Sequence, residues 1–408
     1  MSVISQPPNS IIMKRLLSFF FILFSAVLLI EARVPNPIVI PDVPGYHTLK
    51  LEFHVHTVFS DGSVWPTTRV QEAWYEGLDG LSITDHIEAG LQRTIKKFPS
   101  DSIDRNTSWK LAFEKAKSMG LICIHGCEIT LGSNYFPGHF NAHFISDADA
   151  LAEVEEKALN STKDKEKRQE KALFATLKAA REQGAFLVWN HPNWIRQAPV
   201  ETEWYPIHER IYNKGLIDGI EIINQCGGLY SPEAFHWAIE KNLAVISGSD
   251  AHGPMFECVD WALGEYRPMT LVFAKGRTEA DVREALDARR TAVLDRNKVY
   301  GPEAALEPFA KACLTIENVV YNKNGFTVHF KNNSSIPLEL VKAPGSENLS
   351  YNRMISLNSQ EAEFFSVRFI DSSSVPETVT LNFYLKNFEV DAGIPLKLSY
   401  TISTRPKE

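Results

Sequence analysis

LKLEFHVHTVFSDG (residues 49–62) ends a largely apolar segment with two histidines, His54 and His56, at alternate positions. Alternate residues of a β-strand point to the same face, so a strand here brings both imidazoles side by side. Burying two neighbouring imidazoles is unfavourable without compensation, and a metal ion is the commonest compensation because neutral imidazole is a good ligand. From this stretch alone, the alternative is that both histidines line the exposed face of an edge strand.

Short apolar runs alternate with helical stretches over residues 45–303. The runs are LEFHV (51–55), GLSIT (80–84), LICIHG (121–126), AFLVWN (185–190), GIEII (219–223), LAVISG (243–248) and MTLVFA (269–274). Segments between them, such as TTRVQEAWYEG and SPEAFHWAIEKNL, have helical spacing and end at Gly or Asn. Seven strands that alternate with helices predict a parallel α/β barrel rather than an open sheet.

Ionisable residues occur at or just after the ends of five of the first six predicted strands. Each is weak evidence alone, since SDG is a common turn and DAH after SGS is an ordinary helix N-cap. In a parallel barrel, however, the carboxyl ends of the strands meet at one rim, where the chemistry takes place. The sequence therefore predicts a metal site at this rim. The candidate ligands are His54, His56, Asp61, His86, Glu128, His139, His191, Asp250 and His252.

The number and type of these candidates constrain the metal. Six imidazoles and three carboxylates are too many for one tetrahedral ion, and they suit two or three divalent ions with a bridging carboxylate. Nitrogen and oxygen ligands fit zinc, manganese or iron, which the sequence does not separate. A thiolate zinc site is not expected, because the five cysteines form no CxxC pairs and Cys123 and Cys127 are expected in the core.

The order of these motifs resembles the PHP (polymerase and histidinol phosphatase) family. The family pattern is HxH followed by D or H, then DH, then E followed by H, then H, then DxH, and every step is present over roughly residues 50–300. The resemblance implies a distorted (β/α)7 barrel with three metal ions. It places His54, His56, Glu128 and Asp250 on the first ion, Glu128, His139 and His191 on the second, and Asp61, His86 and His252 on the third.

Some choices within these motifs depend on local sequence. PGHFNAH offers His139 or His143, and His139 is preferred because PGHFN matches the family motif better. His125 points away from Glu128 on the predicted strand and is expected in the core. Asp85, which precedes His86, either orients that histidine or is a turn residue.

A narrower resemblance extends past the ligands. EITLGSNYFPGHFNAHFI (128–145) and YSPEAFHWAIEKN (230–242) are similar to exported bacterial PHP proteins, which include phosphodiesterases acting on small dialkyl or aryl phosphate diesters. The expected reaction is hydrolysis of a phosphate ester by a metal-activated water, so no protein nucleophile is expected. Rim motifs rich in aromatic and amide side chains favour a diester over a dianionic monoester, with Asn141, Trp194 and Arg267 as candidate substrate contacts.

Three alternatives remain open at this stage. They are a phosphomonoesterase of the same family, an amidohydrolase-like metal hydrolase, and a non-catalytic binding protein, because a fold does not fix the chemistry. A net charge of −8 over 408 residues argues against nucleic acid or an anionic membrane as a partner. The oligomeric state is not predicted.

The two ends of the chain differ from this central part. Residues 1–32 have the pattern of a signal peptide with an upstream extension, with Lys14 and Arg15 before the uncharged residues 16–30 and cleavage after Ala32. We therefore expect export to the periplasm or beyond without stable membrane insertion, the alternative being a membrane anchor. GFTVHF (325–330), VTLNFYL (379–385) and LKLSYTIS (396–403) alternate at period two and predict an accessory β-sandwich over residues 310–405.

Overall fold

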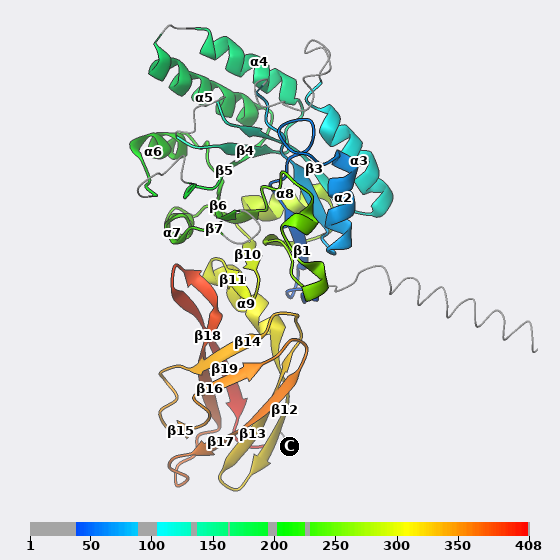
Figure 1. Ribbon diagram of the computed structural model, residues 1–408. Coiled ribbons are helices and arrows are strands. Elements are labelled where there is room, and N and C mark those ends of the chain that lie inside the picture. Colours follow the sequence, from blue (N-terminus) through cyan, green and yellow to red (C-terminus); the bar gives the residue numbers. More distant parts are fainter. Residues whose placement is uncertain are drawn as a thin grey trace, which may run out of the picture.

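The computed structural model describes residues 38–88, 104–131, 137–161, 164–194, 202–224 and 229–406. The expected signal peptide, residues 1–32, lies outside these ranges. An α/β part is followed by a β-rich module at the carboxyl end of the chain (Figure 1). Within the described ranges, no helix combines the length and the apolar character that crossing a membrane requires.

A continuous series of strands forms the α/β part. β1 (His47–Glu52), β2 (Gly80–Ile83) and β3 (Ile122–Ile129) pair in parallel. β5 (Phe186–Trp189), β6 (Gly219–Asn224) and β8 (Ala244–Gly248) form a second parallel group. β4 (Phe140–His143) lies between the two groups and is antiparallel to both β3 and β5.

The two ends of this strand series meet beyond β1 and β8. Val55 forms a parallel bridge with Ala251, and the His56 backbone nitrogen donates to the Ala251 carbonyl at 3.2 Å. Apolar side chains at alternate positions fill the interior between the strands, as expected for strands that enclose a core. They include Leu49 and Leu51 of β1, Phe53 directly after β1, Ile124 of β3, Phe186 and Val188 of β5, and Ala244 and Ile246 of β8.

Helices cover the outside of these strands (Figure 1). Local sequence explains several of their starts: Asp147 caps α4 (Ala148–Leu159), and Ser231 caps α7 (Pro232–Glu240) with Pro at the first turn. The other covering helices are α2 (Pro66–Tyr75), α3 (Thr107–Met119), α5 (Lys165–Glu182), α6 (Pro206–Asn213) and α8 (Glu279–Asp287). Cys123 and Cys127 are buried and unpaired, as the sequence predicts.

Two strands depart from the expected all-parallel arrangement. β4 occupies a stretch that the sequence assigns to a loop, and β9 (Met269–Ala274) is antiparallel to β1. In each case the described residues between the strand and the one before it in the chain contain no α-helix, so they provide no crossover to bring the chain back in the same direction. β4 thereby places His139 at the edge of β3, which carries Glu128.

The carboxyl-terminal module contains two packed sheets. One has the order β12 (Leu314–Asn322), β13 (Gly325–Asn332), β17 (Ala362–Phe369), β15 (Leu349–Ser350), and the other combines β14 (Leu338–Lys342), β16 (Met354–Leu357), β18 (Thr378–Asp391) and β19 (Ile394–Ser403). α9 (Glu303–Cys313) leads into the module. β18 pairs in parallel with β11 (Lys298–Tyr300), which itself pairs with β10 (Thr291–Asp295), so the module's sheet continues that of the α/β part.

Candidate metal centre

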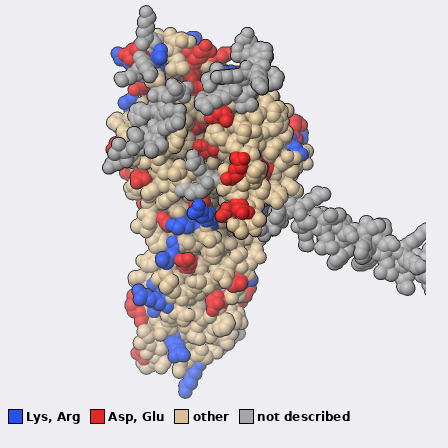
Figure 2. Space-filling model, in the orientation of Figure 1, with Lys and Arg blue, Asp and Glu red and all other residues tan. Residues whose placement is uncertain are grey.

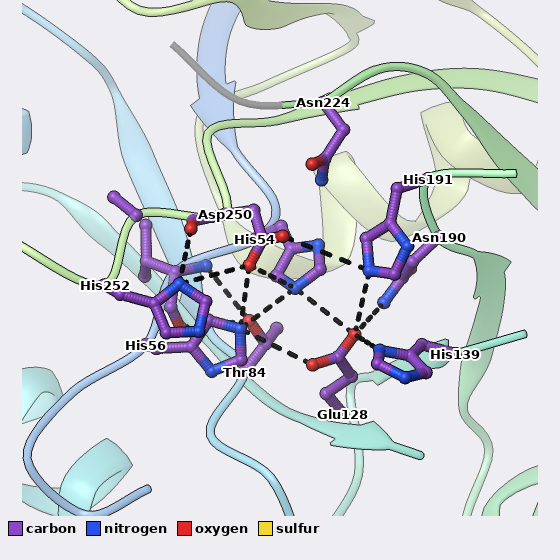
Figure 3. A network of polar contacts seen from close by, with 12 residues as sticks. His54, His56, Thr84, Glu128, His139, Asn190, His191, Asn224, Asp250 and His252 are labelled. Carbon is purple, nitrogen blue, oxygen red and sulfur yellow. Dashed lines mark hydrogen bonds and ion pairs between the residues drawn. The ribbon is translucent and has the colours of Figure 1, made fainter. Parts of the chain in front are cut away.

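The structure brings all nine candidate ligands together at the carboxyl ends of the strands. Figure 3 labels His54, His56, Glu128, His139, His191, Asp250 and His252 among them. β1 leads directly into His54 and His56, β3 carries Glu128, and His191 follows β5. The ligand atoms form four overlapping groups. Within each group, all ligand atoms lie within 4.8 Å of one another. The groups are His56, Asp61, His86 and His252; His54, His56 and Glu128; His54, His191 and Asp250; and Glu128, His139 and His191.

Glu128 lies between two sets of imidazoles. Its Oε1 lies 3.1 Å from His139 Nδ1 and 3.4 Å from His191 Nε2. Its Oε2 lies 3.0 Å from His86 Nδ1 and 3.4 Å from His56 Nε2. Because its two oxygens face different histidines, this carboxylate is placed to bridge two ions.

The other two carboxylates also lie close to imidazoles of the cluster. Asp250 Oδ1 lies 3.1 Å from His56 Nε2 and 3.4 Å from His54 Nε2. Asp61 Oδ1 lies 3.2 Å from His252 Nε2. The side chains of His54 and His56 are fully buried, whereas that of His252 is 43% exposed, so the described residues open the centre to solvent at the Asp61–His252 side.

Charge within the cluster explains the pKa shifts of its members. Burial lowers the pKa of His56 to about 4, with neighbouring imidazoles acting in the same direction. Burial opposes protonation of His86, but Glu128 and Asp61 outweigh it and raise its pKa to about 9. The pKa of His252 is also raised to about 9, by Asp61 against the effect of burial. The carboxylates therefore make this region favourable for positive charge.

The donor set fits divalent metal ions. It consists of imidazole nitrogens and carboxylate oxygens, which together suit zinc, manganese or iron. Asp61 Oδ1 and His86 Nδ1 are buried and have no correctly directed hydrogen bond within the described residues. Buried polar atoms of this kind are costly unless a partner satisfies them, and a cation would do so.

Arg69 holds together the ends of β1 and β8, which lead into His54, His56, Asp250 and His252. This buried guanidinium, on α2, donates from Nε to the His56 carbonyl at 2.9 Å and from Nη2 to the Ala251 carbonyl at 2.6 Å. Its Nη1 donates to the Gly253 carbonyl at 2.9 Å and to Glu72. The backbone beside Asp250 and His252 is thus fixed to the backbone of His56.

Asp85 has a different partner from the one considered for it. Its carboxylate accepts hydrogen bonds from Thr57 and from the Ser60 hydroxyl, which lies 2.5 Å away, and it is not bonded to His86. The Ser60 hydroxyl in turn lies 3.3 Å from His56 Nδ1. Asp85 therefore orders the loop between His56 and Asp61 instead of orienting the histidine that follows it.

The three candidate substrate contacts lie in different surroundings. Trp194 packs edge-on against the rings of His139 and His191, each with a centroid distance of 5.3 Å. Asn141 is buried in β4 and donates to the Phe53 carbonyl at 3.3 Å. The contact of either residue with substrate stays a prediction.

Arg267 corrects the third of these predictions. The sequence suggests a rim cation, but the side chain is fully buried and its guanidinium lies 2.8 Å from Glu76 and 3.2 Å from Glu52. Its role is to neutralise two buried carboxylates, so the prediction that it meets the substrate phosphate is wrong.

The two remaining histidines of β3 and β4 lie outside the centre. His143, the alternative to His139, lies 2.9 Å from the Ser82 hydroxyl and belongs to none of the ligand groups. His125 is buried and stacks on Trp109 with a centroid distance of 4.3 Å, as expected for a core residue.

Two residues that the sequence patterns do not identify, Glu221 and Asn190, contact candidate ligands without being candidate ligands themselves. Glu221 in β6 contacts His54, and Asn190 donates from Nδ2 to Glu128 Oε1 at 2.9 Å. The sequence contains a signal for each, because Glu221 interrupts an apolar run and Asn190 immediately precedes His191. A polar residue at this point in a strand has many structural uses, however, and the sequence does not show that Glu221 contacts His54 or that Asn190 contacts Glu128.

Among solved structures, the chain is similar to a protein from Bacteroides vulgatus described as a two-domain protein containing a predicted PHP-like metal-dependent phosphoesterase. The two chains are 39% identical with a TM-score of 0.77, and the match covers 90% of this chain and 98% of that one. No family model matches the chain, and no curated protein matches it.

Two further structures are more distant. A candidate metal-dependent phosphoesterase from Bifidobacterium adolescentis has 19% identity and a TM-score of 0.37, over 59% of this chain and 96% of its own. An amidohydrolase from Chromobacterium violaceum has 15% identity and a TM-score of 0.36, over 60% of this chain and 97% of its own. Neither likeness is strong enough to bear on the chemistry of this centre.

Proposed function

Because this chain belongs to the PHP family of metal-dependent phosphoesterases, we propose that it is a phosphodiesterase that hydrolyses small phosphate diesters. The observation that supports a diester is the pairing of the arginines beside the centre. Arg69 is paired with Glu72, and Arg267 with Glu52 and Glu76. A monoester dianion needs additional positive charge near the metals, and neither guanidinium supplies it.

The nine candidate ligands would hold two or three divalent ions of zinc, manganese or iron. When bound, these ions supply an acidified water as nucleophile and positive charge for the phosphoryl oxygens. The protein's own contribution is to fix the ligands: Glu128 spans two groups, and Arg69 fixes the strand ends on which His56 and Asp250 lie. Trp194 offers an apolar surface beside His139 and His191 for an organic group of the substrate.

The face of the molecule drawn in Figure 2 is consistent with a small substrate. On the face seen in Figure 2, lysine and arginine side chains are interspersed with aspartate and glutamate, and several acidic side chains lie over the α/β part. A polyanion such as nucleic acid is usually bound by a continuous basic area. We therefore propose a small phosphate ester as the partner of the centre.

A paired assay tests the diester proposal. Full-length protein loaded with manganese or zinc is assayed on bis-p-nitrophenyl phosphate and on p-nitrophenyl phosphate, with His191→Ala as a variant expected to lose both activities. We expect kcat/KM to be at least about tenfold higher for the diester, equivalent to about 1.4 kcal/mol of transition-state stabilisation. A ratio in favour of the monoester would instead identify a phosphomonoesterase.

We also propose that the protein is exported, on the basis of the basic and apolar pattern of residues 1–32. Expression of the full chain in a bacterial host, followed by fractionation and amino-terminal sequencing, tests this. A mature protein that begins at Arg33 in the periplasmic fraction is the expected result. An uncleaved cytoplasmic protein would contradict it.

A further inference from the structure

Glu221 connects two ligands of the candidate metal centre through its two carboxylate oxygens. It lies on β6, its side chain is fully buried, and its Oε1 lies 2.8 Å from His54 Nδ1. The other ring nitrogen of this histidine, Nε2, faces the centre, 3.4 Å from Asp250 and 3.5 Å from Glu128. Glu221 therefore contacts His54 from the side opposite the other ligands.

The second oxygen of Glu221 supports a different ligand. Oε2 accepts a hydrogen bond from the backbone nitrogen of His191 at 2.9 Å and another from Asn224 Nδ2 at 3.0 Å. His191 has a positive φ of 32°, a conformation that non-glycine residues rarely adopt without outside support. Figure 3 shows His191 and His54 on neighbouring parts of the centre, with Asn224 above them.

Gly248 on β8 makes the contact between Glu221 and His54 possible. A Cβ atom at this position would overlap both Glu221 Oε1 and the Cβ of His54. Only glycine leaves room for the carboxylate and the imidazole to meet. Residues of β6 and β8 and His54 after β1 thus meet at this one hydrogen bond.

We propose that Glu221 is a positioning residue that fixes His54 and His191 for metal binding. A carboxylate acceptor requires His54 to carry a proton on Nδ1, which leaves the Nε2 lone pair directed at the centre. The same carboxylate also fixes the backbone of His191, which belongs to the ligand group with Glu128 and His139. Loss of Glu221 should therefore weaken metal binding at both groups, although Glu221 itself is not a ligand.

Glu221→Gln is the sharpest test because the shape is kept and one acceptor becomes a donor. Oε2 already receives two N–H groups, so the new amide nitrogen has to face His54 Nδ1. His54 would then accept at Nδ1 and carry its proton on Nε2, where the lone pair is needed for metal. The matched control is Glu155→Gln on α4, a buried glutamate whose pKa is raised to about 10 by burial and by Glu88. Because Glu155 is already protonated at neutral pH, glutamine is its close mimic.

The experiment measures zinc uptake by full-length protein in competition with a chromophoric chelator. We expect Glu221→Gln to weaken zinc affinity by about ten- to a hundredfold, the usual effect of losing a partner that orients a ligand, and Glu155→Gln to match the wild type. Wild-type zinc affinity in Glu221→Gln would overturn the proposal. Zinc uptake requires no substrate, so this result is independent of any preference for diesters.

A second measurement covers the case in which Glu221→Gln fails to fold. In the zinc-loaded wild type, ¹⁵N chemical shifts of the histidine rings should show His54 protonated at Nδ1 and bound to metal through Nε2. A metal bound to Nδ1 of His54 would overturn the proposal without any variant.

Discussion

Asp85 holds Thr57 by two hydrogen bonds, one to the backbone nitrogen at 2.7 Å and one to the hydroxyl at 2.6 Å. Thr57 immediately follows His56, and the loop that it begins carries Asp61. Asp85 is not a candidate ligand, but it thus fixes the segment between two candidate ligands, His56 and Asp61. Its removal should reduce metal binding without removing a ligand atom.

Asp85→Asn tests this relationship. The amide removes the negative charge and replaces one acceptor by a donor, so a hydroxyl of Thr57 or Ser60 has to accept where it now donates, and the loop loses its charge-assisted hydrogen bonds. We expect metal affinity and kcat/KM to fall by about ten- to a hundredfold. The control is Asp371→Asn in the module, where Asp371 makes the same pair of bonds to the nitrogen and hydroxyl of Ser373. Equal metal affinity in both variants would contradict the expectation.

Arg267 provides a prediction about stability. Replacing Arg267 by Met leaves Glu52 and Glu76 buried without their cation, and breaking a buried ion pair in this way costs about 3–5 kcal/mol. The free energy of unfolding in urea measures this cost. The control is Arg277→Met, which removes a partly exposed pair with Asp79 and should cost at most about 1 kcal/mol. Similar losses of unfolding free energy in the two variants would contradict the expected larger contribution of the buried ion pairs of Arg267.

The position of the centre could be predicted from the sequence because strand ends are readable. His54, His86, Glu128 and His191 each follow or end an apolar run, and parallel strands bring such ends to one rim. Strand order alone therefore predicts that these residues lie at one rim, but it does not predict which side chains contact each of them.

The errors have a common physical cause, which is that the sequence does not show which side chains approach from distant elements. Arg267 meets a glutamate from β1 and another from the end of α2, and these pairings decide whether it is buried or at the rim. The antiparallel strand β4 is only four residues long, and the sequence FNAH has too few apolar positions for alternation to be recognised. The partners of Glu221 likewise come from other elements, His54 after β1 and His191 after β5, and are not visible in the sequence.

His125 gives a pH prediction that is independent of metal. Burial lowers its pKa from about 6.5 to about 4, so the folded state binds fewer protons than the unfolded state between these values. The stability it contributes is complete above pH 6.5 and is lost as the pH falls toward 4. We expect wild type to lose about 2 kcal/mol more free energy of unfolding than His125→Phe between pH 7 and pH 5.

Phenylalanine suits this comparison because it keeps the stacking on Trp109 and removes the titrating group. Urea unfolding of both proteins at the two pH values gives the difference directly, and other titrating groups cancel because they are shared. Parallel pH profiles for the two proteins would contradict the expected role of His125.

Phe388 tests whether the module and the α/β part unfold together. It is buried on β18, pairs with Val299 of β11, and stacks on Phe309 of α9. Phe388→Ala should cost about 3–5 kcal/mol, the usual loss for a buried phenylalanine. Since the two parts share this sheet, a single transition with a lower midpoint is expected by near-UV circular dichroism. Ile370→Ala, at a site that is 67% exposed, is the control. Two separate transitions would show that the parts are independent.

Trp194 provides the prediction that connects the structure most directly to substrate choice. Its ring lies against His139 and His191 and is half-buried, so an organic group of a bound ester can pack on the remaining face. Loss of this surface removes apolar contact from an aryl ester but little from a dimethyl ester. We expect Trp194→Ala to raise KM for bis-p-nitrophenyl phosphate by about tenfold, equivalent to about 1.4 kcal/mol of lost binding.

Metal content separates this effect from damage to the centre, because Trp194 also packs on two candidate ligands. Trp194→Phe keeps an aromatic surface and should give an intermediate KM with the metal content of the wild type. If KM for dimethyl phosphate rises as much as KM for the aryl diester, Trp194 supports the centre rather than the substrate. The same conclusion follows if Trp194→Ala loses metal in proportion to its loss of activity, since an apolar contact with substrate has no effect on an ion bound by imidazole and carboxylate.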